Sequence, residues 1–202
     1  MSAVGSMKEN IHPEEIVIPD QFYDNTKRRI STFFGDGIVA HVSLADPICN
    51  NLSGTLYQSA EKAGAKVHKG GVYICIEGPQ FSTRGESYIY KGWGVDIIGM
   101  TNVTEAKLAR EAEICYSTIA LVTDYDCWHH EEEAVTTDAI IAILGKNVET
   151  SKKIIKEAVS SISVESECLC HNALRDAIIT SRDSIPAEAK ERLRLIIGKY
   201  VS

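Results

Sequence analysis

Two aspartates separated by a single residue follow the longest apolar run in the sequence. Asp124 and Asp126 lie in the stretch TDYDCW, residues 123–128, directly after the run ICYSTIALV, residues 114–122. In an extended segment, side chains at positions i and i+2 point to the same side, so both carboxyls can face one ligand. Because two nearby carboxylates repel each other, we expect the pKa of one to rise, which leaves one proton donor and one acceptor.

A ligand that carries an acceptor beside a donor would satisfy such a pair. The Hoogsteen edge of adenine has this pattern, with N7 next to the 6-amino group. Protonation of N7 would make the purine a better leaving group if its bond to a sugar were broken. The motif leaves two alternatives open, solvated turn residues and a magnesium site. The sequence has no P-loop beside the motif, because Gly70 and Gly71 do not fit that pattern.

The composition is typical of a globular protein with one main domain. Of the 202 residues, 44% are hydrophobic and 24% are charged, and the formal net charge is −7 with the basic residues scattered. This charge pattern argues against a nucleic-acid partner. No apolar run approaches the roughly 20 residues of a membrane-spanning helix, and the first ten residues lack the layout of a signal peptide. We expect a cytoplasmic enzyme with a single α/β domain over residues 1–202, ending in a helical tail from about residue 136.

Strand-like and helix-like stretches alternate along the chain, which is typical of an α/β fold with a largely parallel sheet. Asn102 and Glu105 match a capping box at the start of a helix. Two further helical stretches, divided near Pro186, are expected in the tail. Strands are expected at residues 14–20, 36–45, 71–77, 95–100 and 114–123, and helices at residues 46–65, 84–92, 104–113 and from 137 onward.

Three loops are expected to form one pocket. In open α/β sheets, ligands bind outside the carboxyl ends of the strands. This rule selects EGPQFST (77–83), GMTN (99–102) and TDYD (123–126), each of which follows an expected strand.

The six cysteines do not have the spacing of a zinc site. None of them forms a C-x-x-C pair, so no metal is expected. Free thiols are the favoured interpretation. Disulfide bonds between some of them remain an alternative, which inside a cell would suggest a hyperthermophile. The cysteines are Cys49, Cys75, Cys115, Cys127, Cys168 and Cys170.

Three strings together resemble a known family. They are EGPQFSTRGES (77–87), DIIGMTNVTEAKLARE (96–111) and ALVTDYDCW (120–128). The sequence resembles the 5′-methylthioadenosine phosphorylases, in the trimeric branch of the purine nucleoside phosphorylase superfamily, from about Ala3 to His171. The resemblance implies a mixed, mostly parallel central sheet flanked by helices. It also implies cleavage of methylthioadenosine by inorganic phosphate to adenine and 5-methylthioribose 1-phosphate, with no metal or organic cofactor, in a homotrimer or homohexamer.

The resemblance implies roles for residues at matching positions. Asp126 would bond or protonate adenine N7 and Asp124 would accept from the 6-amino group, which favours adenine over hypoxanthine or guanine. Phe81 would pack against base and ribose, and Met100 would lie under the ribose. Thr101 would bond phosphate near the start of a helix, where the helix dipole favours anions.

Other matching positions concern the 5′ end of the substrate. His41 resembles a histidine that reaches across a subunit boundary towards the methylthio group, although a histidine in an apolar strand can also be a core residue. Thr137, Ile140 and Ile141 correspond to the lining of a dry pocket, which would penalise a free 5′-hydroxyl. The polar Thr137, and Gly99 where some relatives carry asparagine, leave the preference for methylthioadenosine over adenosine open.

The first residues match a later part of the family's fold. Ser2 and Ala3 fit positions that contact phosphate, and Ala3 and Gly5 fit positions that contact the nucleoside. Thr123 would also bind the substrate. The family's first strand, its glycine-rich phosphate loop and an Arg-His pair that grips phosphate have no counterpart in this sequence. The alternatives are therefore a broader purine nucleoside phosphorylase, a nucleoside hydrolase, or an adenine-nucleoside binder without activity.

Overall fold

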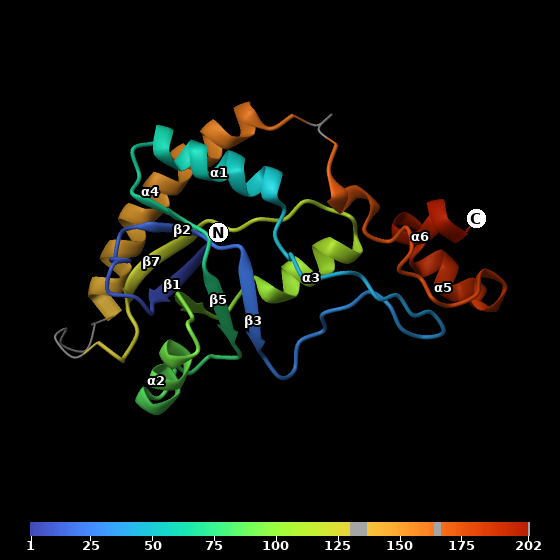
Figure 1. The fold of residues 1–202 in the computed structure, drawn as a ribbon, viewed down its shortest axis with the longest axis horizontal. Helices are drawn as coiled ribbons and strands as arrows, with labels where there is room; N and C mark the ends of the chain where they lie inside the picture. The colour runs from blue at the N-terminus through green and yellow to red at the C-terminus, as the bar shows by residue number, and fades with distance from the viewer. Residues whose placement is uncertain (130–136, 164–166, 202) are drawn as a thin grey trace.

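A seven-stranded mixed sheet forms the centre of the molecule, with helices packed against it (Figure 1). The computed structural model describes residues 1–129, 137–163 and 167–201, with the backbone alone for residues 137–140. The strand order is β3-β5-β6-β1-β7-β2-β4. The strands are β1 (Ser2–Ser6), β2 (Ile16–Ile18), β3 (Gln21–Asn25), β4 (Val67–Lys69), β5 (Val72–Ile76), β6 (Ile97–Gly99) and β7 (Ala120–Tyr125).

Most strand pairs are parallel, as the sequence predicted. The parallel pairs are β1–β7, β2–β4, β3–β5 and β5–β6, and the antiparallel pairs are β1–β6 and β2–β7. The strands β6 and β7 therefore flank β1 but run in opposite directions. This arrangement decides where their carboxyl ends lie in the functional site.

The helices cover both faces of the sheet. Figure 1 shows α1 and α4 side by side, and they share a buried cluster with β2 and β7 that includes Leu56, Leu121 and Ile154. On another part of the sheet, Tyr90 of α2 packs with Ile98 of β6. The helices are α1 (Asn50–Lys62), α2 (Arg84–Gly92), α3 (Val103–Glu111), α4 (Thr137–Ser161), α5 (Ala187–Arg192) and α6 (Arg194–Val201), with 3₁₀ helices η1 (Leu169–Asn172) and η2 (Arg182–Ser184). None of the helices in the described residues has the length and apolar character of a membrane span.

The tail forms a small cluster of its own, away from the sheet in Figure 1. Ile38 is buried there against Leu193 and Ile197, which lie in and beside α5 and α6. The expected division near Pro186 is displaced, because this proline is the N-cap of α5 and the two helices divide at Leu193.

Several expected elements differ in the structure. The segment 36–45 is not a strand, because its apolar residues pack against the tail and its only bridge to a distant segment joins Ala40 to Ile178 in the described residues. The strand expected from residue 114 begins at Ala120. The sequence did not predict β3, which is polar and lies at the sheet edge, or β4, which has three residues.

The capping box predicted at Asn102 is wrong, although α3 does begin after this residue. Asn102 has a φ of 79°, and its side chain does not cap the helix. Its Oδ1 instead accepts from the hydroxyl of Tyr116 at 3.2 Å. A capping box is present at α2, where Thr83 and Glu86 bond each other's backbone amides.

Candidate active site

The three predicted loops do meet in one pocket, as expected. Its volume is about 370 Å³, which is in the range of small-molecule sites. Because β6 and β7 run in opposite directions, their carboxyl ends do not lie at the same edge of the sheet. The pocket extends along β1, which lies between these two strands and lines it from Ser2 to Gly5. Of the residues singled out from the sequence, the pocket is lined by Ser2, Ala3, Gly5, Phe81, Met100, Thr101, Thr123, Asp124 and Asp126.

A β-bulge brings two consecutive polar residues of β7, Thr123 and Asp124, into the pocket, and Asp126 follows just beyond the strand. Val4 pairs with Val122, but the next residue of β1, Gly5, pairs with Asp124, so Thr123 is the extra residue. The hydroxyl of Thr123 lies 3.2 Å from the carbonyl oxygen of Val4 and 2.5 Å from Oδ1 of Asp124. Simple alternation along the strand would have placed only the two aspartates on this side.

Asp126 is held by α2 and β1. The fully buried hydroxyl of Ser87, in the first turns of α2, donates to Oδ2 of Asp126. The backbone amide of Asp126 donates to the carbonyl of Ser6 at 3.0 Å. These contacts fix the carboxyl at the end of the pocket.

The predicted rise in the pKa of one carboxyl is present at Asp126. Burial is the largest cause of this rise, and the negative charge of Glu86 adds to it. Hydrogen bonds from Ser87 and from the amide of Cys127 oppose the rise without cancelling it. The sequence had suggested repulsion by the neighbouring aspartate as the main cause of the raised pKa. The largest cause is instead desolvation of the half-buried carboxyl. Asp126 therefore holds a proton to a higher pH than an ordinary aspartate.

Three hydroxyls gather at the other end of the pocket. Oγ of Ser2 lies 2.8 Å from Oγ1 of Thr101 and 3.0 Å from the hydroxyl of Tyr73. Burial raises the pKa of Tyr73, so this hydroxyl stays protonated. Gly99 makes the arrangement possible, because a Cβ at this position would overlap the hydroxyl of Tyr73. The glycine at position 99, where some relatives carry asparagine, therefore has a steric reason in this chain: a larger side chain would collide with Tyr73.

Two apolar side chains form a further part of the lining. Met100 packs against Gly78, where an added Cβ would lie 2.6 Å from the methionine sulfur. Phe81 is 79% exposed and lies between the pocket and a neighbouring hollow. An exposed aromatic ring at the mouth of a pocket is available to cover a ligand.

Two of the predicted residues, His41 and Ile141, do not line the pocket. His41 is exposed and lines a separate hollow with Lys107 and Glu111, so the alternative of a core histidine is wrong. Ile141 is 60% exposed and does not line the pocket. The side chains of Thr137 and Ile140 lie outside the described residues.

Two side chains that position others were not predicted from the sequence. Ser87 could have been found from the T-x-x-E capping signal at Thr83 and Glu86, which fixes the start of α2 and places this serine one turn into the helix. Tyr73 gave no signal, because a tyrosine inside an apolar strand is an ordinary core residue. The pocket is also lined by Met1, Val4, Ile76, Ser82, Ile98 and Gly99.

The first comparison defines the class of protein. Residues 1–160 match the model of the phosphorylase superfamily. Among solved structures, a methylthioadenosine phosphorylase from an antarctic soil metagenomic library superposes with a TM-score of 0.91 at 50% identity, over 96% of this chain and 69% of that one. The methylthioadenosine phosphorylase of Schistosoma mansoni in complex with tubercidin has a TM-score of 0.76 at 36% identity, over 82% of this chain and 64% of that one. The predicted fold class is confirmed.

Sequence relatives identify the family within this superfamily. The S-methyl-5′-thioadenosine phosphorylase of Geobacter sulfurreducens is 61% identical over 202 residues, which is 100% of this chain and 71% of the relative. The protein of the same name from Koribacter versatilis is 56% identical over 200 residues, which is 99% of this chain and 68% of the relative. The chain belongs to the phosphorylase superfamily and, within it, to the S-methyl-5′-thioadenosine phosphorylase family.

Proposed function

We propose that this chain is a pentosyltransferase that cleaves S-methyl-5′-thioadenosine with inorganic phosphate, releasing adenine and 5-methylthioribose 1-phosphate. One observation carries the proposal. A half-buried aspartate with a raised pKa, Asp126, lines a pocket of nucleoside size, and its neighbour Asp124 lines the same pocket. The names of relatives at 56% and 61% identity favour this substrate over a broader range of purine nucleosides.

The base is bound at the aspartate end of the pocket. The carboxyl of Asp126 gives its proton to N7 of the purine as the bond between N9 and C1′ breaks, and the bonding electrons pass into the imidazole ring. Asp124 accepts from the 6-amino group. A phosphate oxygen forms the new bond to C1′, and the carboxylate of Asp126 regains, through water, the proton that the phosphate carried. Adenine leaves as a neutral molecule.

Phosphate is bound at the hydroxyl end of the pocket. Ser2 and Thr101 supply hydroxyls 2.8 Å apart, close enough to bond one anion together, and the backbone of Ala3 lies beside them in the lining. The amino end of α3 follows Thr101 directly, and its dipole favours a negative charge. Phosphate acts here as a co-substrate, and we propose no metal or organic cofactor for the reaction in this pocket.

The sugar lies between these two ends. Met100 offers an apolar surface under the ribose, and Phe81 covers base and ribose from the mouth of the pocket. Gly5 and Thr123 contact the nucleoside from the sheet. This order places the attacking phosphate and the leaving base on opposite sides of C1′, as a displacement requires.

The methylthio end requires residues beyond this pocket. We propose a homotrimer or homohexamer in which His41 of one chain reaches the 5′ end of a substrate bound by its neighbour, where Thr137, Ile140 and Ile141 give an apolar lining. Light scattering after size-exclusion chromatography measures the subunit number, and a monomer would contradict this part of the proposal. Placement of the reaction in purine and methionine salvage, and the cytoplasmic location, stay predictions.

The reaction is tested by incubating the purified chain with S-methyl-5′-thioadenosine, with and without phosphate, and measuring free adenine. Adenine released only with phosphate supports the proposal. Release without phosphate supports a hydrolase, and adenine binding without release supports an inactive binder. Parallel assays with adenosine and inosine measure how strictly the 5′ group and the 6-amino group are selected.

A further inference from the structure

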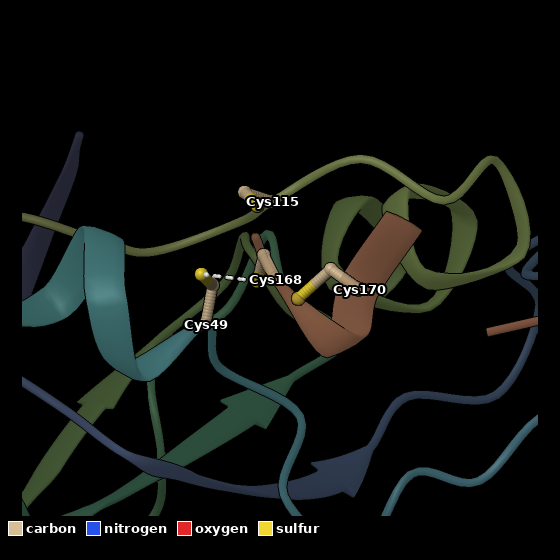
Figure 2. A group of neighbouring side chains, drawn as sticks. All are labelled: Cys49, Cys115, Cys168 and Cys170. Atoms are coloured by element: carbon tan, nitrogen blue, oxygen red, sulfur yellow. Dashed lines mark hydrogen bonds between the residues drawn. The ribbon is translucent and has the colours of Figure 1, made fainter. Parts of the chain in front are cut away.

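Four of the six cysteines, distant in sequence, come together outside the nucleoside pocket. Cys49 is the residue before α1, Cys115 lies in the segment before β7, and Cys168 and Cys170 lie before and within η1. Figure 2 shows the four side chains converging from these three segments. We refer to these four residues as the cysteine cluster.

The spacing of the sulfur atoms suits a single small ion. All four Sγ atoms lie within 4.8 Å of one another, and those of Cys49 and Cys168 are 3.5 Å apart. In a tetrahedral site with Zn–S bonds of about 2.3 Å, neighbouring sulfur atoms are about 3.8 Å apart. Small side-chain rotations would therefore bring the four sulfurs onto one ion.

The surroundings of the cluster also suit bound thiolates. Nε2 of His171 lies 3.5 Å from Sγ of Cys115, where a ring N–H can donate to a metal-bound sulfur. Arg110 lines the same hollow as Cys49 and Cys168 and offers a positive charge opposite the excess negative charge of a tetrathiolate. Hollows of about 470 Å³ and 420 Å³ adjoin the cluster, and Cys49 lines both, which gives an ion a path to the sulfurs.

We propose that Cys49, Cys115, Cys168 and Cys170 bind one Zn²⁺ ion as thiolates, in a closed structural site. An all-sulfur tetrahedral ligand set is typical of zinc in structural sites and leaves no position for a substrate. Binding forms four Zn–S bonds and releases the protons of the four thiols to solvent. Disulfides would join the same atoms only in pairs, whereas one ion uses the whole cluster at once. The spacing rule for zinc sites did not predict this site, because its ligands come from three distant segments.

The site would fasten the tail to the start of α1 and to the segment before β7. The backbone amide of Cys49 already donates to the carbonyl of Tyr116 at 2.9 Å, and Nδ2 of Asn51 lies 3.3 Å from the carbonyl of Glu167. These bonds join α1 to the segment before β7 and to the residues before η1. A metal ion would replace weak contacts among the same three segments by four strong bonds, so its removal should lower Tm.

The test measures metal in the chain purified without chelators under reducing conditions. Elemental analysis is expected to give one zinc per chain, and exchange with Co²⁺ is expected to produce the visible absorption of a tetrahedral thiolate site. Cys168→Ser is expected to lose the zinc, and Cys168→His, which keeps a ligating side chain, is expected to retain it. Cys127→Ser is the matched control, because this cysteine lies outside the cluster, and it should keep the wild-type zinc content.

Several results would overturn the proposal. One is a metal-free wild-type chain whose four thiols all react with a thiol reagent. Another is a chain whose mass is lower by the hydrogens of two disulfides, which would show that oxidation uses the cluster. Iron in place of zinc would also contradict it. If Cys168→Ser fails to fold, zinc content and the Co²⁺ spectrum of the wild-type chain still decide.

Discussion

Two groups of side chains lie near β7, and they differ in how the sequence encodes them. Asp124 and Asp126 lie at the end of this strand and just beyond it and line the proposed nucleoside pocket, whereas Cys115 precedes the strand and belongs to the cysteine cluster. The pocket is built from short consecutive motifs, so its residues can be recognised along the chain. The cysteine cluster joins segments more than fifty residues apart, and only the fold brings them together.

The two regions also differ in what their contacts do. In the pocket, hydrogen bonds hold groups of the lining, such as the bond from Ser87 to Asp126. Around the cluster, contacts join the tail to the segment between α3 and β7. Glu113 is an example, since its carboxylate accepts from the amide of Leu174 at 2.9 Å and from the hydroxyl of Tyr200 at 2.6 Å. We therefore expect substitutions in the pocket to change activity and substitutions around the cluster to change stability.

The largest effect is expected for Asp126→Asn. An amide cannot give a proton to N7, so kcat/KM for adenine release should fall by roughly 10²–10⁴-fold, the usual contribution of a general acid. Steady-state kinetics measures the change. Asp176→Asn, at an exposed aspartate in the tail, is the control and should leave kcat/KM unchanged. Wild-type turnover by the Asp126 variant would remove this residue from its proposed role.

The same substitution should not destabilise the fold at neutral pH. Because burial raises the pKa of Asp126 above the ordinary value of 3.8, its contribution to stability is present at low pH and is lost as pH rises through the raised pKa. At neutral pH the buried charge is therefore unfavourable, and Asp126→Asn should have an equal or higher Tm. A Tm of Asp126→Asn far below that of wild type at neutral pH would contradict this account of the carboxyl.

Glu113→Ala should show the opposite behaviour. It leaves the amide of Leu174 and the hydroxyl of Tyr200 without their acceptor and removes the partner of Lys199, which should lower the free energy of unfolding by about 2–3 kcal/mol. Chemical denaturation measures this change. The control is Glu191→Ala, which breaks an exposed ion pair with Arg194 and should have an effect below about 1 kcal/mol.

The effect of Glu113 should also depend on pH. Burial alone would raise its pKa, but Lys199, Tyr200 and the amide of Leu174 outweigh burial and hold the pKa below the ordinary value of 4.5. The contribution is therefore present above pH 4.5 and lost as pH falls through the lowered pKa. Denaturation curves of wild type and Glu113→Ala should converge in acid. Equal differences at every pH would contradict the ionic part of the interaction.

Ser87→Ala should have a smaller effect, through the position of Asp126. Loss of the hydroxyl removes a hydrogen bond that lowers the pKa of Asp126, so the pKa should rise further. We expect kcat/KM to fall about 10-fold, in line with one lost hydrogen bond to a charged group. The alkaline limb of the pH profile, where a general acid loses its proton, should move to higher pH. Ser59→Ala, at a buried serine in α1, is the control and should not move that limb.

The smallest effect is expected for Phe81→Leu. The leucine keeps an apolar cover but loses stacking on the base, so KM should rise roughly 3-fold to 10-fold with little change in kcat. Phe33→Leu makes the same substitution at another exposed phenylalanine, outside the pocket lining. An equal rise in KM for both variants would contradict a role for Phe81 in binding.

The sequence predicted the elements whose signal is local. The helices predicted at residues 84–92 and from Thr137 onward match α2 and the start of α4. The apolar stretches around β5 and β6 were strands as expected. The strand predicted at residues 36–45 was wrong because the apolar residues of this segment pack on the tail. An apolar pattern predicts that residues are buried, but it does not say which part of the chain buries them.

The site divides in the same way. The sequence by itself determined which side chains line the pocket, because Asp124, Asp126 and Thr101 stand at the ends of strands or just beyond them. Only the tertiary structure decided that burial, more than the neighbouring acid, raises the pKa of Asp126, and that four distant cysteines meet. Desolvation and metal-ligand geometry depend on segments far apart in sequence, and the order of residues along one segment contains no record of those neighbours.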